Sequence, residues 1–231
     1  MPIYWLDPNS LVFPPAHLAS EEGIIAVGGD LSAARLLEAY RLGIFPWFNE
    51  DDPILWWTPD PRFVLFPEDL KVAKSMRPLF NQKTFTLSMD QAFPEVIKAC
   101  QSCYRPGQGG TWITEEMREA YIHLHNQGYA HSVEVWQGED LVGGLYGIAL
   151  GKVFYGESMF AFASNASKFG FISLVRQLKK WGFTLIDCQQ ETNHLASLGA
   201  KAIPRKQFLA HLQQNPLEAT KVGSWHFEET E

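Results

Sequence analysis

The sequence predicts an α+β fold that combines a small N-terminal domain with a C-terminal domain built around an antiparallel meander. Hydrophobic residues make up 46% of the 231-residue chain, which is enough for a substantial core. A segment dense in proline and aromatic residues interrupts the chain at residues 44–67. Beyond it, the apolar period changes from helical to alternating near residue 130 and returns to helical near residue 167.

The N-terminal part contains one expected helix, followed by the proline-rich segment. The helix starts after a capping side chain near residue 30 and ends at Gly43. Five prolines in residues 44–67 exclude a regular helix or a central strand there. We place the domain boundary at the end of this segment, which gives domains at residues 1–66 and 67–231.

A cluster of positive charge follows this boundary. The chain has a net charge of −7, yet residues 70–89 contain four basic residues and no acidic one. This basic cluster consists of Lys71, Lys74, Arg77 and Lys83. Spacing of i, i+3 and i+6 predicts that the first three share one face of a short helix, which Pro78 ends. That face is either an ordinary solvated surface or an anion site.

The rest of the chain alternates between helices and a meander. Apolar alternation predicts three antiparallel strands within residues 131–160. A helix and an apolar strand follow them, so the expected core has the order βββαβ. The expected helices lie at residues 92–99, 114–128, 167–181 and 205–214, and the last strand lies at residues 183–188.

Composition argues against several classes of protein. A net charge of −7 argues against a nucleic-acid coat or a general membrane binder. No apolar run approaches the roughly 20 residues that span a bilayer, and the first residues lack the features of a signal peptide. Three scattered cysteines do not make a disulfide framework. We therefore expect a cytoplasmic protein that does not bind membranes.

The sequence also lacks motifs for metals and nucleotides. Cys100 and Cys103 form a CxxC pair, but no second pair accompanies them, so buried or half-buried thiols are the better interpretation. His123 and His125 lie two apart on an expected helix and point to different faces. The chain contains no glycine-rich dinucleotide loop and no P-loop. We predict no metal site.

Three tryptophans of the proline-rich segment, Trp47, Trp56 and Trp57, allow two interpretations. They form the core of a small domain, or they present flat faces on which an aromatic ligand stacks. Stacking on such faces contributes roughly 1–3 kcal/mol per nucleic-acid base. Because the basic cluster follows in sequence, an adenosine or an RNA end is a candidate ligand.

Polar side chains lie at the ends of two expected strands. Glu157 marks one end, and Asp187 and Gln189 mark the other. Either these are structural hydrogen-bonding groups, or they meet in one pocket where carboxylates bind an ammonium group or assist proton transfer. The apolar residues expected to line that pocket are Leu145, Phe154, Met159 and Ile186.

Several strings of residues resemble the leucyl/phenylalanyl-tRNA–protein transferase family. They include GGDLSAARLLEAY at 28–40, PILWWTPDPR at 53–62, HSVEVW at 131–136, GESMF at 156–160 and DCQ at 187–189. The strings occur in family order and cover nearly the whole chain. The resemblance implies that the C-terminal domain is similar to N-acetyltransferases. The chain lacks the glycine-patterned pyrophosphate loop of those enzymes, so acetyl-CoA is not expected.

The resemblance implies an aminoacyltransferase without a cofactor. Such an enzyme moves Leu or Phe, and Met less efficiently, from charged tRNA to the α-amine of a protein that starts with Arg or Lys, which creates a signal for proteolysis. The aminoacyl ester is already activated, so no ATP, metal or cofactor is needed. Two other functions stay open: an acyltransferase of the same fold that uses acyl-CoA, and a non-catalytic tRNA or peptide adaptor.

The resemblance also implies roles for individual residues. Gln189 orients the attacking amine, and Asp187 either orients Gln189 or takes the proton, with the ribose hydroxyls of the tRNA as the alternative acceptor. Glu157 seats the donor amino acid beside the apolar pocket, whose narrow entrance excludes β-branched side chains. The residues expected around the terminal adenosine are Tyr40, Trp47, Trp112 and Tyr121. The family's need for tRNA favours phosphate binding by the basic cluster.

Overall fold

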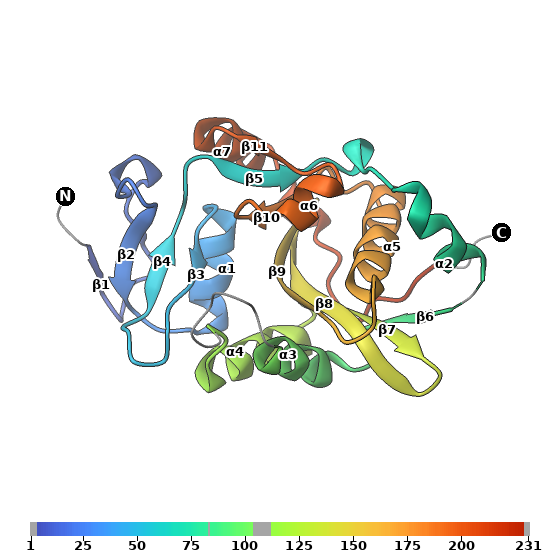
Figure 1. Ribbon diagram of the computed structural model, residues 1–231. Coiled ribbons are helices and arrows are strands. Elements are labelled where there is room, and N and C mark those ends of the chain that lie inside the picture. Colours follow the sequence, from blue (N-terminus) through green and yellow to red (C-terminus); the bar gives the residue numbers. More distant parts are fainter. Residues whose placement is uncertain (1–3, 83, 104–111, 229–231) are drawn as a thin grey trace.

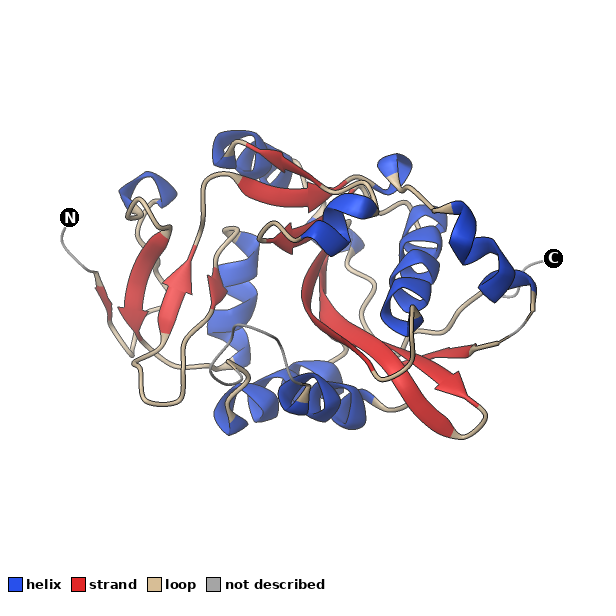
Figure 2. Ribbon diagram, viewed as in Figure 1, coloured by secondary structure: helices blue, strands red, loops and turns tan. Residues whose placement is uncertain are grey.

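The chain forms two β-sheets with helices packed around them (Figure 1). The computed structural model describes residues 4–82, 84–103 and 112–228. Within these residues, the N-terminal part of the chain builds a four-stranded sheet, and later segments build most of a seven-stranded sheet. Side chains of both parts join one hydrophobic cluster. Figure 2 shows the mixture of helices and strands, and the α+β prediction is confirmed.

The first sheet has the strand order β1-β2-β4-β3. Helix α1 (Ala33–Arg41) packs against it, and the Ser32 side chain caps this helix by accepting a hydrogen bond from the Arg35 N–H. Gly43 follows the helix with a φ of 74°, which suits glycine at a helix end. The strands are β1 (Trp5–Leu6), β2 (Ile24–Gly28), β3 (Phe45–Pro46) and β4 (Leu55–Trp57).

Residues 44–67 contain inner strands, so the prediction that their prolines exclude a central strand is wrong. Strand β4 lies between β2 and β3 in the first sheet, and β5 (Arg62–Leu65) lies between β11 and β10 in the second. The prolines are compatible with these inner strands because the strands are only a few residues long and the prolines lie between them. Pro46 itself lies in the edge strand β3, where a missing N–H costs no inner ladder bond.

The second sheet has the strand order β11-β5-β10-β9-β8-β7-β6. Three antiparallel strands, helix α5 (Ala166–Lys180) and strand β10 follow one another along the chain, and β10 pairs with β9 in parallel. The predicted βββαβ order is therefore confirmed. The strands are β6 (Thr86–Met89), β7 (Ala130–Gln137), β8 (Asp140–Leu150), β9 (Val153–Ala161), β10 (Leu185–Gln189) and β11 (Lys201–Ile203).

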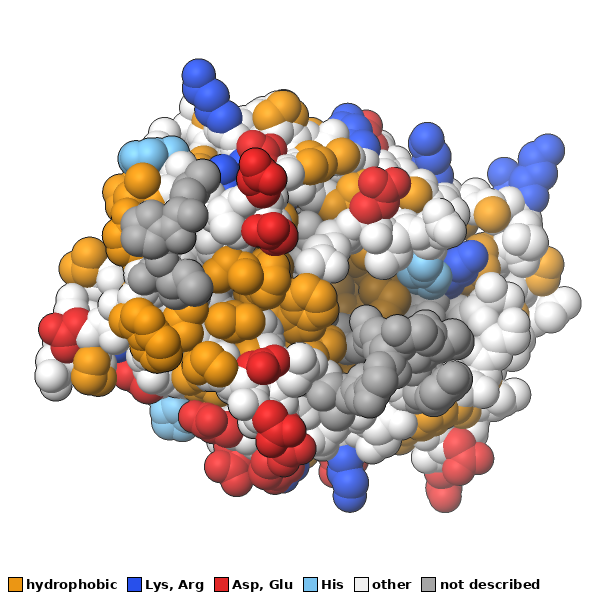
Figure 3. All heavy atoms as spheres, turned by 60° about the vertical axis from the view of Figure 1, so that its left-hand side comes forward, with side chains coloured by type: hydrophobic (Ala, Val, Ile, Leu, Met, Phe, Trp, Pro, Cys, Tyr) orange, Lys and Arg blue, Asp and Glu red, His pale blue; other side chains and the backbone are white. Residues whose placement is uncertain are grey.

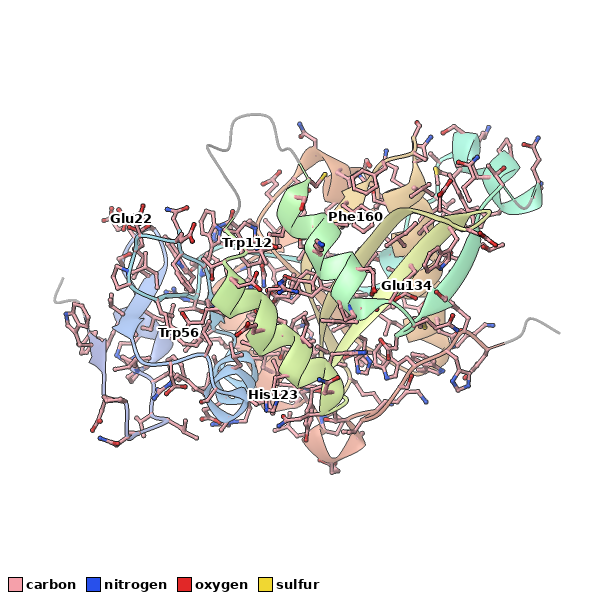
Figure 4. The ribbon with its side chains drawn as sticks, turned by 90° about the horizontal axis from the view of Figure 1, so that it is seen from below. Glu22, Trp56, Trp112, His123, Glu134 and Phe160 are labelled. Carbon is pink, nitrogen blue, oxygen red and sulfur yellow. The ribbon has the colours of Figure 1, made fainter. Side chains whose placement is uncertain are left out.

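Helices cover both faces of this sheet. Helices α3 (Phe93–Ser102) and α4 (Glu115–Asn126) pack on the face that joins the core of the first sheet, and α5 packs on the other. Figure 4 looks onto α3 and α4 from outside. Successive side chains of β8 point to opposite faces of the sheet, so Tyr146 belongs to the first core and Leu145 to the second. Two short helices complete the fold, α6 (Asn193–Ser197) and α7 (Arg205–Gln213).

The basic cluster does not share one helical face. Residues 71–73 are not helical, a 3₁₀ turn spans Lys74–Met76, and α2 begins only at Arg77 and runs to Asn81. Pro78 therefore lies in the first turn of a helix rather than at its end. The reason is that a proline lacks only an N–H that the first turn leaves unpaired, and its fixed φ suits a helix start. Lys83 lies outside the described residues.

The two sheets divide earlier in the chain than Pro67. The first sheet includes residues up to Trp57, and Arg62 already belongs to the second. The division into domains at residues 1–66 and 67–231 stays a prediction, whereas the change from one sheet to the other falls between Trp57 and Arg62. After α7 the chain crosses back along the second sheet and buries Trp225 in the second core.

Candidate active site

A cavity of about 420 Å³ lies where the two sheets meet. Residues of β3 line one side of it, and most of the other lining residues belong to β8, β9, β10, α5 and α6. Its size is typical of small-molecule sites. Figure 3 shows hydrophobic side chains gathered in the middle of one face of the molecule and continuing into a hollow. The structure brings together the four apolar residues expected for the pocket: Leu145, Phe154, Met159 and Ile186.

A β-bulge in β9 shapes this cavity. The pairing of β9 with β8 slips by one residue, so that Glu157 is an extra residue opposite no residue of β8. Because the bulge shifts the alternation, Phe154 and Met159 line the same cavity although they are five residues apart. Gly147 faces the bulge, where an added Cβ would lie 2.2 Å from the carbonyl oxygen of Tyr155. A side chain at this position would therefore force the bulge apart.

A second bulge, in β10, brings Gln189 next to Glu157. The pairing of β10 with β5 slips between Asp187 and Gln189, and Gln189 has a left-handed backbone with a φ of 61°. Strand β10 runs parallel to β9 with Asp187 beside Tyr155, so Gln189 comes beside Glu157. The Gln189 Nε2 donates a hydrogen bond of 2.8 Å to Glu157 Oε1. The end of β10 and the bulge of β9 therefore meet in one site, and Glu157 lies within β9 rather than at the strand end that the sequence predicts.

Glu157 is a buried carboxyl group within a network of hydrogen bonds. Tyr121 donates its hydroxyl to Glu157 Oε2 at 3.0 Å, and the Tyr121 and Tyr40 hydroxyls are hydrogen-bonded to each other. Burial raises the pKa of Glu157 from its ordinary 4.5 to about 7, and the nearby negative charge of Asp187 also raises it. Hydrogen bonds from the tyrosines and Gln189 act in the opposite direction. Glu157 therefore changes charge near neutral pH.

Tyr40 and Tyr121 do not line the cavity, and their expected place around a terminal adenosine stays a prediction. Both side chains are completely buried beneath Glu157. Burial and the nearby Glu157 raise the pKa of each tyrosine, so both hydroxyls keep their protons. Their contacts fix the position of the Glu157 carboxyl group.

Asp187 is paired with an arginine that the sequence analysis did not identify. Arg62 on β5 donates from Nε to Asp187 Oδ1 at 2.8 Å and from Nη2 to Oδ2 at 2.6 Å. Both side chains are essentially without exposed surface. The one sequence signal for Arg62 is a charged residue at the start of the apolar stretch RFVLF. A buried charge in a short strand requires a buried partner.

Trp47 and Trp112 both line the cavity and are half-buried. Trp47 packs against Trp57 with ring centroids 5.3 Å apart, and its backbone carbonyl accepts the Trp57 indole N–H. Trp56, by contrast, is wholly buried in the core. The core interpretation therefore holds for Trp56, and stacking of an aromatic ligand on Trp47 stays a prediction. Figure 4 shows Trp112 near the start of α4 and Trp56 among the strands of the first sheet.

The described members of the basic cluster lie on the surface away from the cavity lining. Lys71, Lys74 and Arg77 are all exposed. The Lys71 N–H donates to the carbonyl oxygen of Leu198, just after α6, so the first member lies close to an element of the cavity wall. The three residues form a short exposed strip along the chain rather than a helical face.

The described part of the chain contains no cluster of three or more side chains that could hold a metal ion. Cys100 is buried in α3 and Cys103 is half-buried directly after it. The His125 side chain has a structural contact, because its Nδ1 forms a hydrogen bond with the carbonyl oxygen of Ala130. Across residues 4–82, 84–103 and 112–228, no helix has the length and apolar character needed to cross a bilayer.

Comparison with known proteins identifies close relatives. Residues 64–213 match the family model of leucyl/phenylalanyl-tRNA protein transferase, and residues 29–60 match the model of its N-terminal domain. The leucyl/phenylalanyl-tRNA–protein transferase of Christiangramia forsetii is 58% identical over 212 residues, which cover 91% of this chain and 100% of that protein. The corresponding protein of Pseudomonas fluorescens SBW25 is 53% identical over 223 residues, covering 96% and 98%.

Among solved structures, a GCN5-related N-acetyltransferase from Kribbella flavida matches at 12% identity with a TM-score of 0.36. The match covers 72% of this chain and 59% of that chain. Similarity this low carries no argument about activity.

The raised pKa of Glu157 predicts how stability depends on pH. Between its ordinary pKa of 4.5 and about 7, the folded state holds a proton that the unfolded chain releases, so stability falls as the pH rises through this window. One pKa unit corresponds to about 1.4 kcal/mol, so the loss amounts to a few kcal/mol. Glu157→Gln removes this titration. Urea unfolding between about pH 5 and pH 8 should show the wild type losing stability relative to the variant. Parallel curves would contradict the prediction.

Proposed function

The chain belongs to the leucyl/phenylalanyl-tRNA–protein transferase family, and we propose that it moves leucine or phenylalanine, and methionine less well, to proteins that begin with Arg or Lys. As a member of this family it is an aminoacyltransferase, with an aminoacyl-tRNA as donor and a protein as acceptor. The proposal also gives the product its role as a bacterial signal for proteolysis, and it places the enzyme in the cytoplasm. One observation carries it. An amide and a titrating carboxyl group, 2.8 Å apart, sit at an apolar cavity of amino-acid size.

The apolar part of the cavity holds the side chain of the donor amino acid in this proposal. Its walls are the side chains of Leu145, Phe154, Met159 and Ile186. Leu, Phe and Met share an unbranched CH₂ next to Cα, whereas Ile and Val are branched there. Discrimination by shape at a narrow entrance therefore separates the two groups, since their hydrophobicity is too similar to do so. Ordinary transfer energy would favour Ile as much as Leu.

Glu157 meets the ammonium group of the donor amino acid, and Gln189 orients the attacking amine. The Gln189 Nε2 already donates to Glu157, which leaves its amide oxygen to accept from the acceptor's α-amine. This amine has a pKa of about 7.7–8.0, so part of it is neutral at cellular pH. Its nitrogen bonds to the ester carbon, the bond from that carbon to the ribose oxygen breaks, and one proton passes from the nitrogen to the ribose oxygen.

Asp187 orients Gln189 in this mechanism and does not take the proton. Both of its oxygens accept hydrogen bonds from Arg62, and Oδ1 also accepts the Gln189 backbone N–H at 2.9 Å. The Asp187 side chain has no exposed surface, so it is not placed to meet the acceptor's α-amine. The proton therefore travels by way of the ribose hydroxyls of the tRNA. Asp187 supports catalysis by holding the backbone of Gln189.

The tRNA binds through its terminal adenosine and its acceptor-arm phosphates. Trp47 and Trp112 are the stacking surfaces of the adenosine, since both line the cavity with part of their surface free. Lys71, Lys74 and Arg77 contact phosphates, with Lys83 as a fourth candidate beyond the described residues. Phosphate contacts carry no sequence information, which suits an enzyme that accepts several tRNAs.

Consumption of the donor tests the proposed function against its two alternatives. The protein is incubated with labelled leucyl-tRNA and a peptide that starts with Arg, and separately with labelled acetyl-CoA. We expect label to appear on the peptide only from leucyl-tRNA. Transfer from acetyl-CoA alone would identify a small-molecule acyltransferase. Binding of charged tRNA without any transfer would identify an adaptor.

Replacement of Gln189 tests the reaction centre. We expect Gln189→Ala to fold like the wild type, because the side chain is half-buried at a strand end, and to lose transfer by about 100-fold. Gln137→Ala at the exposed end of β7 is the matched control and should keep full activity. The measurement is the initial rate of transfer to an Arg-starting peptide. A near-native rate in Gln189→Ala would remove this residue from the mechanism.

Replacement of the three described basic residues by alanine tests the tRNA path. Loss of Lys71, Lys74 and Arg77 should weaken tRNA binding and reduce its salt slope by about 0.7–0.9 for each lost phosphate contact. Transfer from phenylalanyl-adenosine should stay nearly unchanged, because this minimal donor has no acceptor arm. Filter binding at several salt concentrations gives the slope. An unchanged slope would show that these residues form only a solvated surface.

A further inference from the structure

We propose that Arg62 is a positioning residue of the reaction, which acts through Asp187 to hold Gln189 in its working geometry. The inference rests on the proposed roles of Asp187 and Gln189. It adds a residue that touches no substrate, since Arg62 lies beneath the cavity and lines none of it. Four side chains then act in series: Arg62, Asp187, Gln189 and Glu157.

The contact between Arg62 and Asp187 is the rigid end of this series. The two residues come from neighbouring antiparallel strands, β5 and β10. Two hydrogen bonds of 2.8 and 2.6 Å join the guanidinium to both carboxylate oxygens. Such a paired geometry fixes the plane of the carboxylate as well as its distance. With 1% and 0% of their surfaces exposed, neither side chain has water as an alternative partner.

Aromatic rings hold the guanidinium itself. The Arg62 guanidinium carbon lies 4.7 Å from the ring centroid of Phe45 on β3 and 4.6 Å from that of Phe208 on α7. Its remaining nitrogen, Nη1, is buried and makes no hydrogen bond within the described part of the chain. Every hydrogen bond that the structure gives this side chain therefore goes to Asp187. The aromatic contacts fix its place without competing for that bond.

Asp187 passes this geometry on to Gln189. Asp187 Oδ1 accepts both the Arg62 Nε–H and the backbone N–H of Gln189. Gln189 has a φ of 61°, a conformation that costs a residue other than glycine free energy and persists only when its surroundings hold it. The hydrogen bond to Asp187 holds it, together with the pairing of Gln189 with Phe63 on β5. The Gln189 side chain is then directed at Glu157.

Arg62 also balances charge beneath the cavity. Asp187 and Glu157 are buried near each other, and the negative charge of Asp187 disfavours ionisation of Glu157. The cation of Arg62 compensates one of the two carboxylates directly. Lysine cannot replace it fully, because an ammonium group has no planar fork that can meet both oxygens of Asp187.

The experiment compares Arg62→Lys, Asp187→Asn and the double variant Arg62→Gln with Asp187→Asn. Transfer from phenylalanyl-adenosine to an Arg-starting peptide gives kcat and the KM of the donor separately. We expect Arg62→Lys to lower kcat by about 100-fold, the cost of a misplacement near 1 Å, with little change in KM. The double variant should be no slower than Asp187→Asn, because Arg62 acts only through Asp187.

Arg35→Lys is the matched control. Arg35 is also wholly buried, but its guanidinium binds backbone carbonyls of Ser10 and Asp7 in the N-terminal segment. We expect this variant to melt at a lower temperature and to keep the wild-type kcat when assayed well below its melting point. If replacing any buried arginine impaired the protein in a general way, the kcat of Arg62→Lys and of Arg35→Lys would fall alike. That result would overturn the inference.

Three further outcomes separate the inference from the proposed function. A wild-type kcat in Arg62→Lys, with Asp187→Asn strongly impaired, would overturn the inference and leave the reaction centre intact. A double variant much slower than Asp187→Asn would show that Arg62 acts by another route and would also overturn it. Full activity in both Asp187→Asn and Gln189→Ala would overturn the reaction centre itself. If Arg62→Lys is less stable than the wild type, its kcat is measured well below its melting point, as for Arg35→Lys.

Discussion

The buried ion pair between Arg62 and Asp187 is the constraint on which the two halves of the molecule depend. Its arginine begins β5, directly after the segment that joins the sheets. Its aspartate lies in the middle of β10, and the rings that flank the guanidinium come from β3 and α7. A buried pair of this kind is seldom more stabilising than well-packed apolar residues, but loss of one partner costs about 3–5 kcal/mol. Its contribution is therefore geometric. It connects β3 of the first sheet, β5 and β10 of the second sheet and helix α7, and the cavity lies at that junction.

The two bulges explain why the cavity has both an apolar wall and a polar edge. A regular strand sends residues five apart to opposite faces, so Phe154 and Met159 could not share a cavity without the extra residue at Glu157. The bulge in β10 does the same for the polar side by turning Gln189 toward β9. The two bulges lie in adjacent parallel strands, and the register of these strands brings Gln189 beside Glu157. Bulges of this kind commonly direct side chains next to active sites.

Much of the fold follows from the sequence, because helices and strands of ordinary length leave a clear period. The meander, α5 and the Thr114 cap are of this kind. The inner strands within residues 44–67 are too short to show a period, and Pro78 starts a helix as readily as it ends one. For the site, Glu157 and Gln189 stand out as polar strand ends. The Arg62 pairing and the burial of Tyr40 depend on contacts between distant segments, for which one sequence has no local signal.

The buried position of Glu157 gives the proposed reaction an energetic direction. In the free protein the ionised carboxylate is disfavoured, as its pKa of about 7 records. An ammonium group beside it restores the charged form, so a donor that carries an amino acid recovers free energy that uncharged tRNA cannot. The α-amine of the transferred residue takes no part in bond formation and keeps this contact in the peptide product. The discharged tRNA loses it at the moment of transfer and is held only by its adenosine and phosphates. The two products are therefore held by different contacts. The reaction weakens the binding of the tRNA and leaves the contact between Glu157 and the peptide product in place.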